Sequence, residues 1–141
     1  MRDYDKVTSL ELVQEGKVST VRHFEEDGVA IHASGRGRTS YLMHKAPTAM
    51  EMLRWLTDCV VPDGCVSVRH YIADHSHEAK RFGDAMIFPN GVRLCVYPES
   101  DRIDLYITKG DTYLEEFTVT SRHPVTTVDD AIAELAHQGI L

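Results

Sequence analysis

The second half of the chain, from residue 84 to residue 120, alternates between apolar and polar residues in short runs. The clearest runs are 92–97 and 102–108, in which every second residue is valine, leucine or isoleucine. Successive side chains of a strand point to opposite faces, so this alternation predicts strands with one covered and one solvated face. The runs are separated by the turn-forming sequences Pro89-Asn90-Gly91, Pro98-Glu99-Ser100-Asp101 and Lys109-Gly110-Asp111. We therefore predict a four-strand antiparallel meander, with strands at 84–88, 92–97, 102–108 and 112–120.

The first half contains further strand patterns, and the first two are joined by the tight-turn sequence Glu15-Gly16. A later stretch, 65–73, also alternates, with Val66, Val68, His70 and Ile72 on one side. We predict strands at 7–14, 17–22, 29–33, 38–44 and 65–73.

Two segments instead follow the period of an α-helix. Thr48 and Glu51 have the spacing of a capping box at the start of a helix expected over 48–60, and Thr127 is the expected cap of a helix over 127–137 that Gly139 ends. Trp55 lies on the flank of the first helix's apolar stripe. The residues expected to form that stripe are Ala49, Met52, Leu53, Leu56, Cys59 and Val60.

These elements predict an α+β fold. The order of the elements favours one curved, mostly antiparallel sheet, covered by the helices at about 48–60 and 127–137. The sequence leaves open whether the N-terminal strands join the C-terminal meander in that sheet. A parallel α/β fold is not expected, because two helices are too few for the crossovers it needs. With 141 residues, of which 43% are hydrophobic and 26% charged, the chain is expected to be a single globular domain, 1–141.

The chain is acidic, with a formal net charge of −7. Such a charge disfavours nonspecific binding to nucleic acid or anionic lipid and fits a partner with a basic surface. No apolar run reaches the 18 or so residues that span a bilayer, and the charged start does not resemble a secretory signal. Three cysteines, an odd number, indicate reduced thiols. We expect a cytoplasmic protein that does not bind membranes.

The densest group of potential metal ligands is His70, His75 and His77, with Asp74 and Glu78 beside them. Imidazole and carboxylate groups are suitable zinc ligands, although a stable site needs three or four that converge. A polar, solvated connection is the alternative interpretation. No other cofactor is expected.

Arg36 and Arg38 lie in the glycine-rich sequence Ser34-Gly35-Arg36-Gly37-Arg38. Backbone N–H groups of such a turn, together with two guanidinium groups, could hold a phosphate or carboxylate. A loop with solvated arginines is the alternative.

A set of acidic and tyrosine residues occupies the strands and turns of the meander. Tyrosines supply much of the binding energy at protein interfaces, and acidic groups steer basic partners. The same tyrosines could simply form stabilising cross-strand pairs. The candidate partner-binding residues are Asp104, Tyr106, Asp111, Tyr113, Glu115 and Glu116.

No sequence motif names a reaction. A Gly-x-Ser-x-Gly elbow, a His-Glu-x-x-His pair, a phosphate-binding loop and a Cys-x-x-Cys pair are all missing from the sequence, so no catalytic residue is predicted. In its acidity, size and lack of catalytic motifs the chain is similar in character to toxin-immunity proteins and phage-encoded inhibitors of bacterial defence. The leading hypothesis is a non-enzymatic inhibitor of a protein partner. The alternatives are a small enzyme or ligand-binding domain that uses the histidine group, with or without zinc, and a structural subunit of a virus or mobile element.

Overall fold

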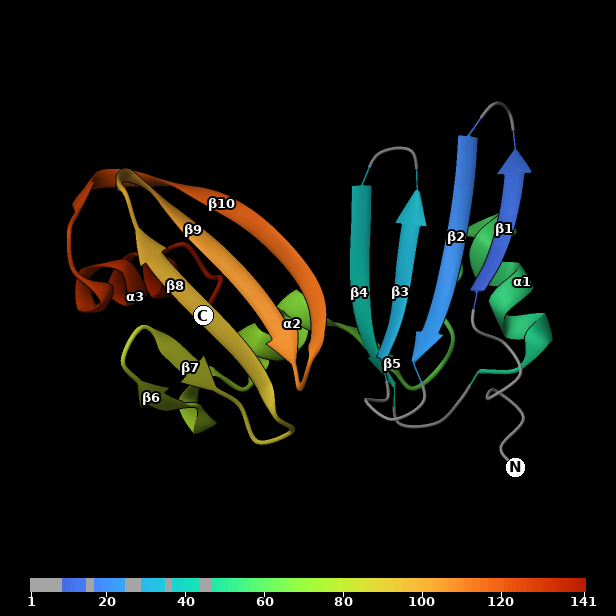
Figure 1. The fold of residues 1–141 in the computed structure, drawn as a ribbon, viewed down its shortest axis with the longest axis horizontal. Coiled ribbons are helices and arrows are strands. Elements are labelled where there is room, and N and C mark those ends of the chain that lie inside the picture. Colours follow the sequence, from blue (N-terminus) through green and yellow to red (C-terminus); the bar gives the residue numbers. More distant parts are fainter. Residues whose placement is uncertain (1–8, 15–16, 25–28, 35–36, 44–46) are drawn as a thin grey trace. The chain divides into compact units, whose positions relative to one another are not determined.

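A computed structural model describes residues 9–14, 17–24, 29–34, 37–43 and 47–141 (Figure 1). The chain divides into two compact units, Met1–Val68 and Arg69–Leu141. Each unit has its own five-stranded antiparallel sheet. The predicted α+β class with antiparallel strands is confirmed, but the strands form two sheets and not the single sheet that we expected. The prediction of one domain is not tested by this division and stays a prediction.

The sheet of the first unit follows chain order, β1-β2-β3-β4-β5, and all neighbouring strands are antiparallel. Its first three connections join adjacent strands, as hairpins do. The strands predicted at 7–14, 17–22, 29–33 and 38–44 are therefore confirmed over the residues that the structure describes. The strands are β1 Ser9–Gln14, β2 Lys17–Phe24, β3 Val29–Ser34, β4 Gly37–Met43 and β5 Cys65–Ser67.

Helix α1 spans Ala49–Asp58 and begins with the predicted capping box. The Glu51 N–H donates to Thr48 Oγ1 and the Thr48 N–H donates to Glu51 Oε1, both at 3.1 Å. The helix ends earlier than predicted, at Asp58, and is capped by Cys59, whose φ of 57° lies in the left-handed region.

The buried face of α1 consists of Met52, Trp55 and Leu56, with Tyr41 and Met43 of β4 packed against it. The Tyr41 and Trp55 rings meet edge to face, with centroids 4.8 Å apart. The expected stripe is thus partly wrong, because Trp55 is core whereas Ala49, Leu53, Cys59 and Val60 are exposed. A large aromatic ring on the flank of a stripe buries more apolar area than the smaller residues do, which rotates the buried face towards it.

The strand predicted over 65–73 is wrong in its second part. After β5, the chain forms helix α2, Val68–Asp74, and the short 3₁₀ turn η2, Ser76–Glu78. Val68 and Ile72 are both buried, and a spacing of four residues places them on one face of a helix as readily as alternation places them on one face of a strand. His70 Nε2 lies 3.1 Å from Asp74 Oδ2, one turn further along this helix.

The sheet of the second unit is a meander in the order β10-β9-β8-β7-β6, with antiparallel neighbours throughout. The predicted four-strand meander is confirmed as β7 to β10. The additional strand β6 escaped prediction because its three residues are all exposed and do not alternate. The strands are β6 Lys80–Phe82, β7 Ala85–Ile87, β8 Val92–Pro98, β9 Ser100–Lys109 and β10 Thr112–Val125.

One face of this second sheet is covered. Helix α3, Val128–His137, packs against β8 and β10 and lies behind the sheet in Figure 1. Its Thr127 cap accepts from the Asp130 N–H, as predicted. Gly139, with a φ of 79°, ends the helix in a Schellman motif, in which the Ile140 N–H donates to the Leu135 carbonyl. The covered face buries Leu94, Val96, Ile103, Leu105, Ile107 and Leu135 completely. Among the described residues of the second unit, no helix packs on the opposite face of β8–β10.

No helix among the residues that the structure describes is long and apolar enough to cross a bilayer.

Candidate functional site

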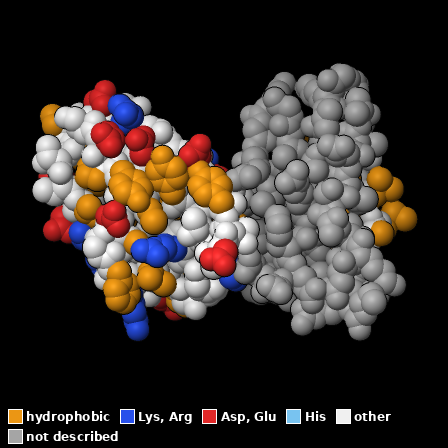
Figure 2. All heavy atoms as spheres, viewed as in Figure 1, with side chains coloured by type: hydrophobic (Ala, Val, Ile, Leu, Met, Phe, Trp, Pro, Cys, Tyr) orange, Lys and Arg blue, Asp and Glu red, His pale blue; other side chains and the backbone are white. Residues whose placement is uncertain are grey.

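The uncovered face of β8, β9 and β10, here called the open face, holds a diagonal of three tyrosines. Tyr97 on β8, Tyr106 on β9 and Tyr113 on β10 occupy successive diagonal positions of the register. The Tyr97 and Tyr106 ring centroids are 5.5 Å apart at 75°, and those of Tyr106 and Tyr113 are 6.4 Å apart at 58°. Figure 2 shows hydrophobic side chains crossing these strands in a band with acidic side chains beside it. The tyrosines are both cross-strand neighbours and partly exposed, so the two interpretations offered by the sequence do not exclude each other.

Two carboxylates lie beside the tyrosine diagonal. Glu116 is opposite Tyr106, and Asp104 is opposite both Tyr97 and Thr118. The Tyr113 hydroxyl donates to Glu116 Oε2 at 2.7 Å. These contacts hold the acidic side chains next to the aromatic rings.

A bulge in β10 removes Glu115 from this face. Tyr113 is opposite Thr108 but Glu115 is opposite Ile107, so one extra residue, Leu114, enters β10 between them. As a result Leu114 and Glu115 are both buried, at 0% and 4% exposure. Glu115 had been expected on the partner-binding surface. The structure places it on the covered face.

Arg69 at the start of α2 supplies the partner of Glu115. Its guanidinium forms an ion pair with the Glu115 carboxylate and also lies 3.8 Å from the centre of the Phe117 ring. A buried carboxylate requires such a partner, because leaving it unpaired would cost several kcal/mol. Glu115 therefore stabilises the fold of the second unit.

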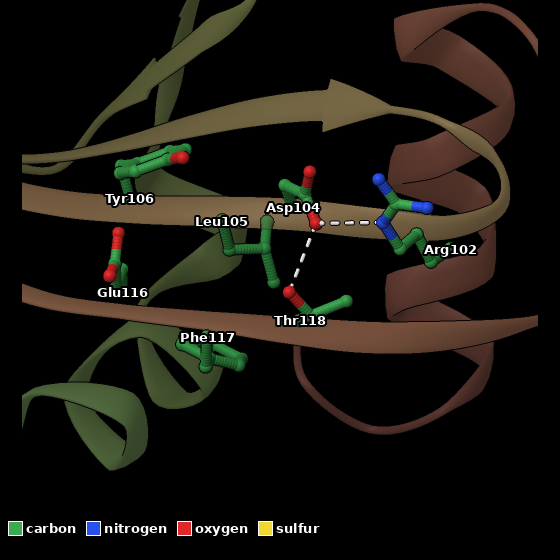
Figure 3. Close-up of a pocket in the computed structure, with 7 residues that line it drawn as sticks. All are labelled: Arg102, Asp104, Leu105, Tyr106, Glu116, Phe117 and Thr118. Atoms are coloured by element: carbon green, nitrogen blue, oxygen red, sulfur yellow. Dashed lines mark hydrogen bonds and ion pairs between the residues drawn. The ribbon is translucent and has the colours of Figure 1, made fainter.

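The open face is hollowed on both sides of Asp104 and Tyr106. The first hollow, drawn in Figure 3, has a volume of about 440 Å³. Within it Asp104 Oδ1 accepts from Thr118 Oγ1 at 3.0 Å and lies 3.4 Å from Arg102 Nε. It is lined by Arg102, Asp104, Leu105, Tyr106, Glu116, Phe117 and Thr118.

The second hollow has a volume of about 390 Å³ and is lined by Tyr97, Glu99, Asp104 and Tyr106. The pKa of the Tyr97 hydroxyl is raised, first by the neighbouring Cys95 thiol and then by burial.

The structure brings together four of the six predicted partner-binding residues, namely Asp104, Tyr106, Tyr113 and Glu116. Asp111 lies exposed in the turn that joins β9 and β10. The prediction omitted Tyr97, Glu99, Arg102 and Thr118. Alternation along β8, β9 and β10 was the available signal for Tyr97, Arg102 and Thr118, whereas Glu99 is placed by the turn after β8.

Two of the three histidines of the candidate zinc group have local contacts. His70 pairs with Asp74, and His75 stacks on Tyr71 at 4.0 Å while its Nδ1 lies 3.0 Å from the Tyr71 carbonyl oxygen. His77 is exposed. In the described part of the chain, no three His, Cys, Asp or Glu side chains are grouped so as to hold a metal ion. The zinc hypothesis stays a prediction.

The candidate anion site falls mostly outside the described residues. Arg36 lies outside them altogether. Arg38 is described only as a backbone position of β4, opposite Ala33 of β3.

No family model, curated protein or solved structure matched this chain.

Proposed function

We propose that this chain is a non-enzymatic binding protein that docks its open face on a basic surface of a protein partner and thereby inhibits it, in the manner of toxin-immunity proteins and phage-encoded inhibitors. The observation that carries the proposal is the tyrosine diagonal, flanked by Asp104 and Glu116, on the sheet face opposite helix α3 of the same unit.

The chemistry of this face suits protein binding. Tyrosine offers a large, stiff side chain with an apolar ring and a polar tip, and it is enriched among residues that dominate interface energies. Tyr97 and Tyr113 are 37% and 42% exposed, so part of each ring is available to a partner.

The charge is concentrated in the second unit. Residues 69–141 contain seven Lys and Arg against twelve Asp and Glu, which gives −5 of the total of −7. An acidic surface accelerates encounter with a basic partner and repels acidic competitors. The expected partner surface is therefore rich in arginine or lysine.

The test is affinity capture from a lysate of the source organism, followed by comparison of variants. Tyr106→Ala should weaken capture at least about tenfold if it is an interface hot spot. Glu116→Lys should also weaken capture. This loss should be larger at low salt than at high salt, because salt screens the repulsion between the new lysine and a basic partner.

Asp58→Lys is the matched control. It makes the same charge change on the exposed last turn of α1, in the first unit, where a cation also suits the helix terminus. The proposal is supported if Asp58→Lys still captures the partner and Glu116→Lys does not. Equal capture by all variants would overturn it.

A further inference from the structure

The second hollow of the open face combines two aromatic rings with two carboxylates. Tyr97 and Tyr106 meet at 75° with centroids 5.5 Å apart, and Glu99 and Asp104 line the same hollow. Cations are attracted to the faces of aromatic rings such as those of tyrosine. Carboxylates beside the rings add hydrogen-bond acceptors for a cationic head group.

Glu99 is held in place by an uncommon turn. Its N–H donates to the Arg102 carbonyl at 2.8 Å, and its own carbonyl accepts from the Asp101 N–H at 2.9 Å. The second bond spans only two residues around Ser100, whose φ is 70°. This is the geometry of a γ-turn with positive φ, which is rare and strained. The turn fixes the backbone of Glu99 at the edge of the hollow.

The carboxylate of Glu99 has no ion-pair partner among the described residues, and Glu99 is exposed. Asp104 is already shared with Arg102, at 3.4 Å, and with Thr118. No lysine or arginine lines the second hollow. The negative charge of Glu99 in the second hollow is therefore available to a cation from a partner molecule.

The first hollow differs in this respect. The first hollow is lined by the Arg102 guanidinium as well as by the carboxylates of Asp104 and Glu116. A second cation would meet repulsion there. Of the two hollows, the second is the better cation acceptor.

We propose that the second hollow, lined by Tyr97, Glu99, Asp104 and Tyr106, is the subsite that takes the guanidinium of a partner's arginine, with Glu99 as its main acceptor. This inference rests on the proposed function and names the chemistry that the open face would recognise. Arginine suits the site better than lysine, because a planar guanidinium can stack on a ring and bind a carboxylate through two N–H groups at once.

The probe is N-acetyl-arginine amide, compared with N-acetyl-citrulline amide, which has nearly the same shape but no charge. Both are titrated into the full chain while the tyrosine ring resonances are followed by NMR. We expect saturable shifts of Tyr97 and Tyr106 with the arginine probe at millimolar concentration and no saturation with citrulline. Tyr97→Ala and Glu99→Gln should each weaken arginine binding about three- to fivefold.

Glu78→Gln is the matched control, since it removes a carboxylate from the exposed η2 turn of the same unit. It should leave the arginine titration unchanged. Equal shifts with both probes, no saturable shift, or titrations unaffected by Glu99→Gln would each overturn the inference.

The two proposals can fail separately. If partner capture is lost in Glu116→Lys but the arginine probe does not bind, the open face docks a partner without an arginine subsite. If the arginine probe binds as described but capture is insensitive to Glu116→Lys and Tyr106→Ala, the subsite stands and the proposed function fails.

Discussion

Glu115 and Glu116 are adjacent glutamates of β10 with different surroundings. Glu115 is buried and paired with Arg69, whereas Glu116 is exposed beside Tyr113. The difference follows from strand alternation and from the bulge at Leu114, which sets the face that each residue occupies. One glutamate stabilises the sheet, and the other belongs to the proposed binding face.

Substitution of the two glutamates should separate these roles. We expect Glu115→Ala to lower the free energy of unfolding by about 1–3 kcal/mol, because it leaves the Arg69 guanidinium without its buried acceptor. Arg69 is half exposed and regains water, which keeps the loss towards the lower end. Glu116→Ala should change the same quantity by less than about 0.5 kcal/mol. Urea unfolding followed by circular dichroism measures both, and equal losses would contradict the assignment of faces.

Glu134 of α3 is a second buried carboxylate, with only 1% exposure. Hydrogen bonds from the backbone N–H and then from the guanidinium of Arg122, both at 2.8 Å, lower its pKa from 4.5 to about 2. A carboxyl whose pKa is lowered in the native state stabilises the fold above its unfolded pKa. That contribution is lost as the pH falls through the native pKa.

The pH dependence of Glu134→Gln should reveal this contribution. At pH 7 the variant should melt at a lower temperature than the wild type. The difference in Tm should shrink as the pH falls from about 4.5 towards 2, where Glu134 becomes protonated in the native protein. Glu116→Gln serves as the control. A difference in Tm that is constant from pH 7 to pH 2 would show that Glu134 does not act through its charge.

Among the helices and strands, α1 shows which residues of a helix become buried. Met50 and Met52 are the same residue type two positions apart, yet Met50 is 66% exposed and Met52 is 1% exposed. The buried position lies with Trp55 and Leu56 on the face that packs against Tyr41 and Met43.

The two methionines form a matched pair for measuring this packing. Met52→Ala should reduce the free energy of unfolding by about 2–5 kcal/mol, because it opens a cavity in the core of the first unit. Met50→Ala should change it by less than about 0.5 kcal/mol. Trp55, the single tryptophan of the chain, reports unfolding of this core by its fluorescence. A similar effect of both substitutions would contradict the observed helix face.

At the scale of the whole molecule, two sheets with separate cores raise the question of cooperativity. The prediction of one domain requires a single unfolding transition, shared by the core around Trp55 and by the tyrosine diagonal. Met52→Ala should then lower the melting temperature reported by Trp55 fluorescence and by the ring resonances of Tyr97 and Tyr106 to the same extent. If only the melting temperature reported by Trp55 fluorescence falls, the two units unfold separately and are two domains.

Features that depend on residues close together in the chain could be predicted from the sequence. Alternation and turn residues located β7 to β10, and capping residues located the starts of α1 and α3, because these signals act over a few positions. The same alternation was ambiguous over 65–73, where Val68 and Ile72 fit either a strand or a helix.

Features that depend on contacts between residues far apart in the chain are visible only in the folded structure. The division of the strands between two sheets and the pairing of Arg69 with Glu115 are of this kind. So is the assembly of Tyr97, Tyr106 and Tyr113 into one diagonal, because strand register and the β10 bulge set which side chains meet across a sheet. The sequence therefore indicated which residue types form the candidate site. The strand register determines which of these residues lie together.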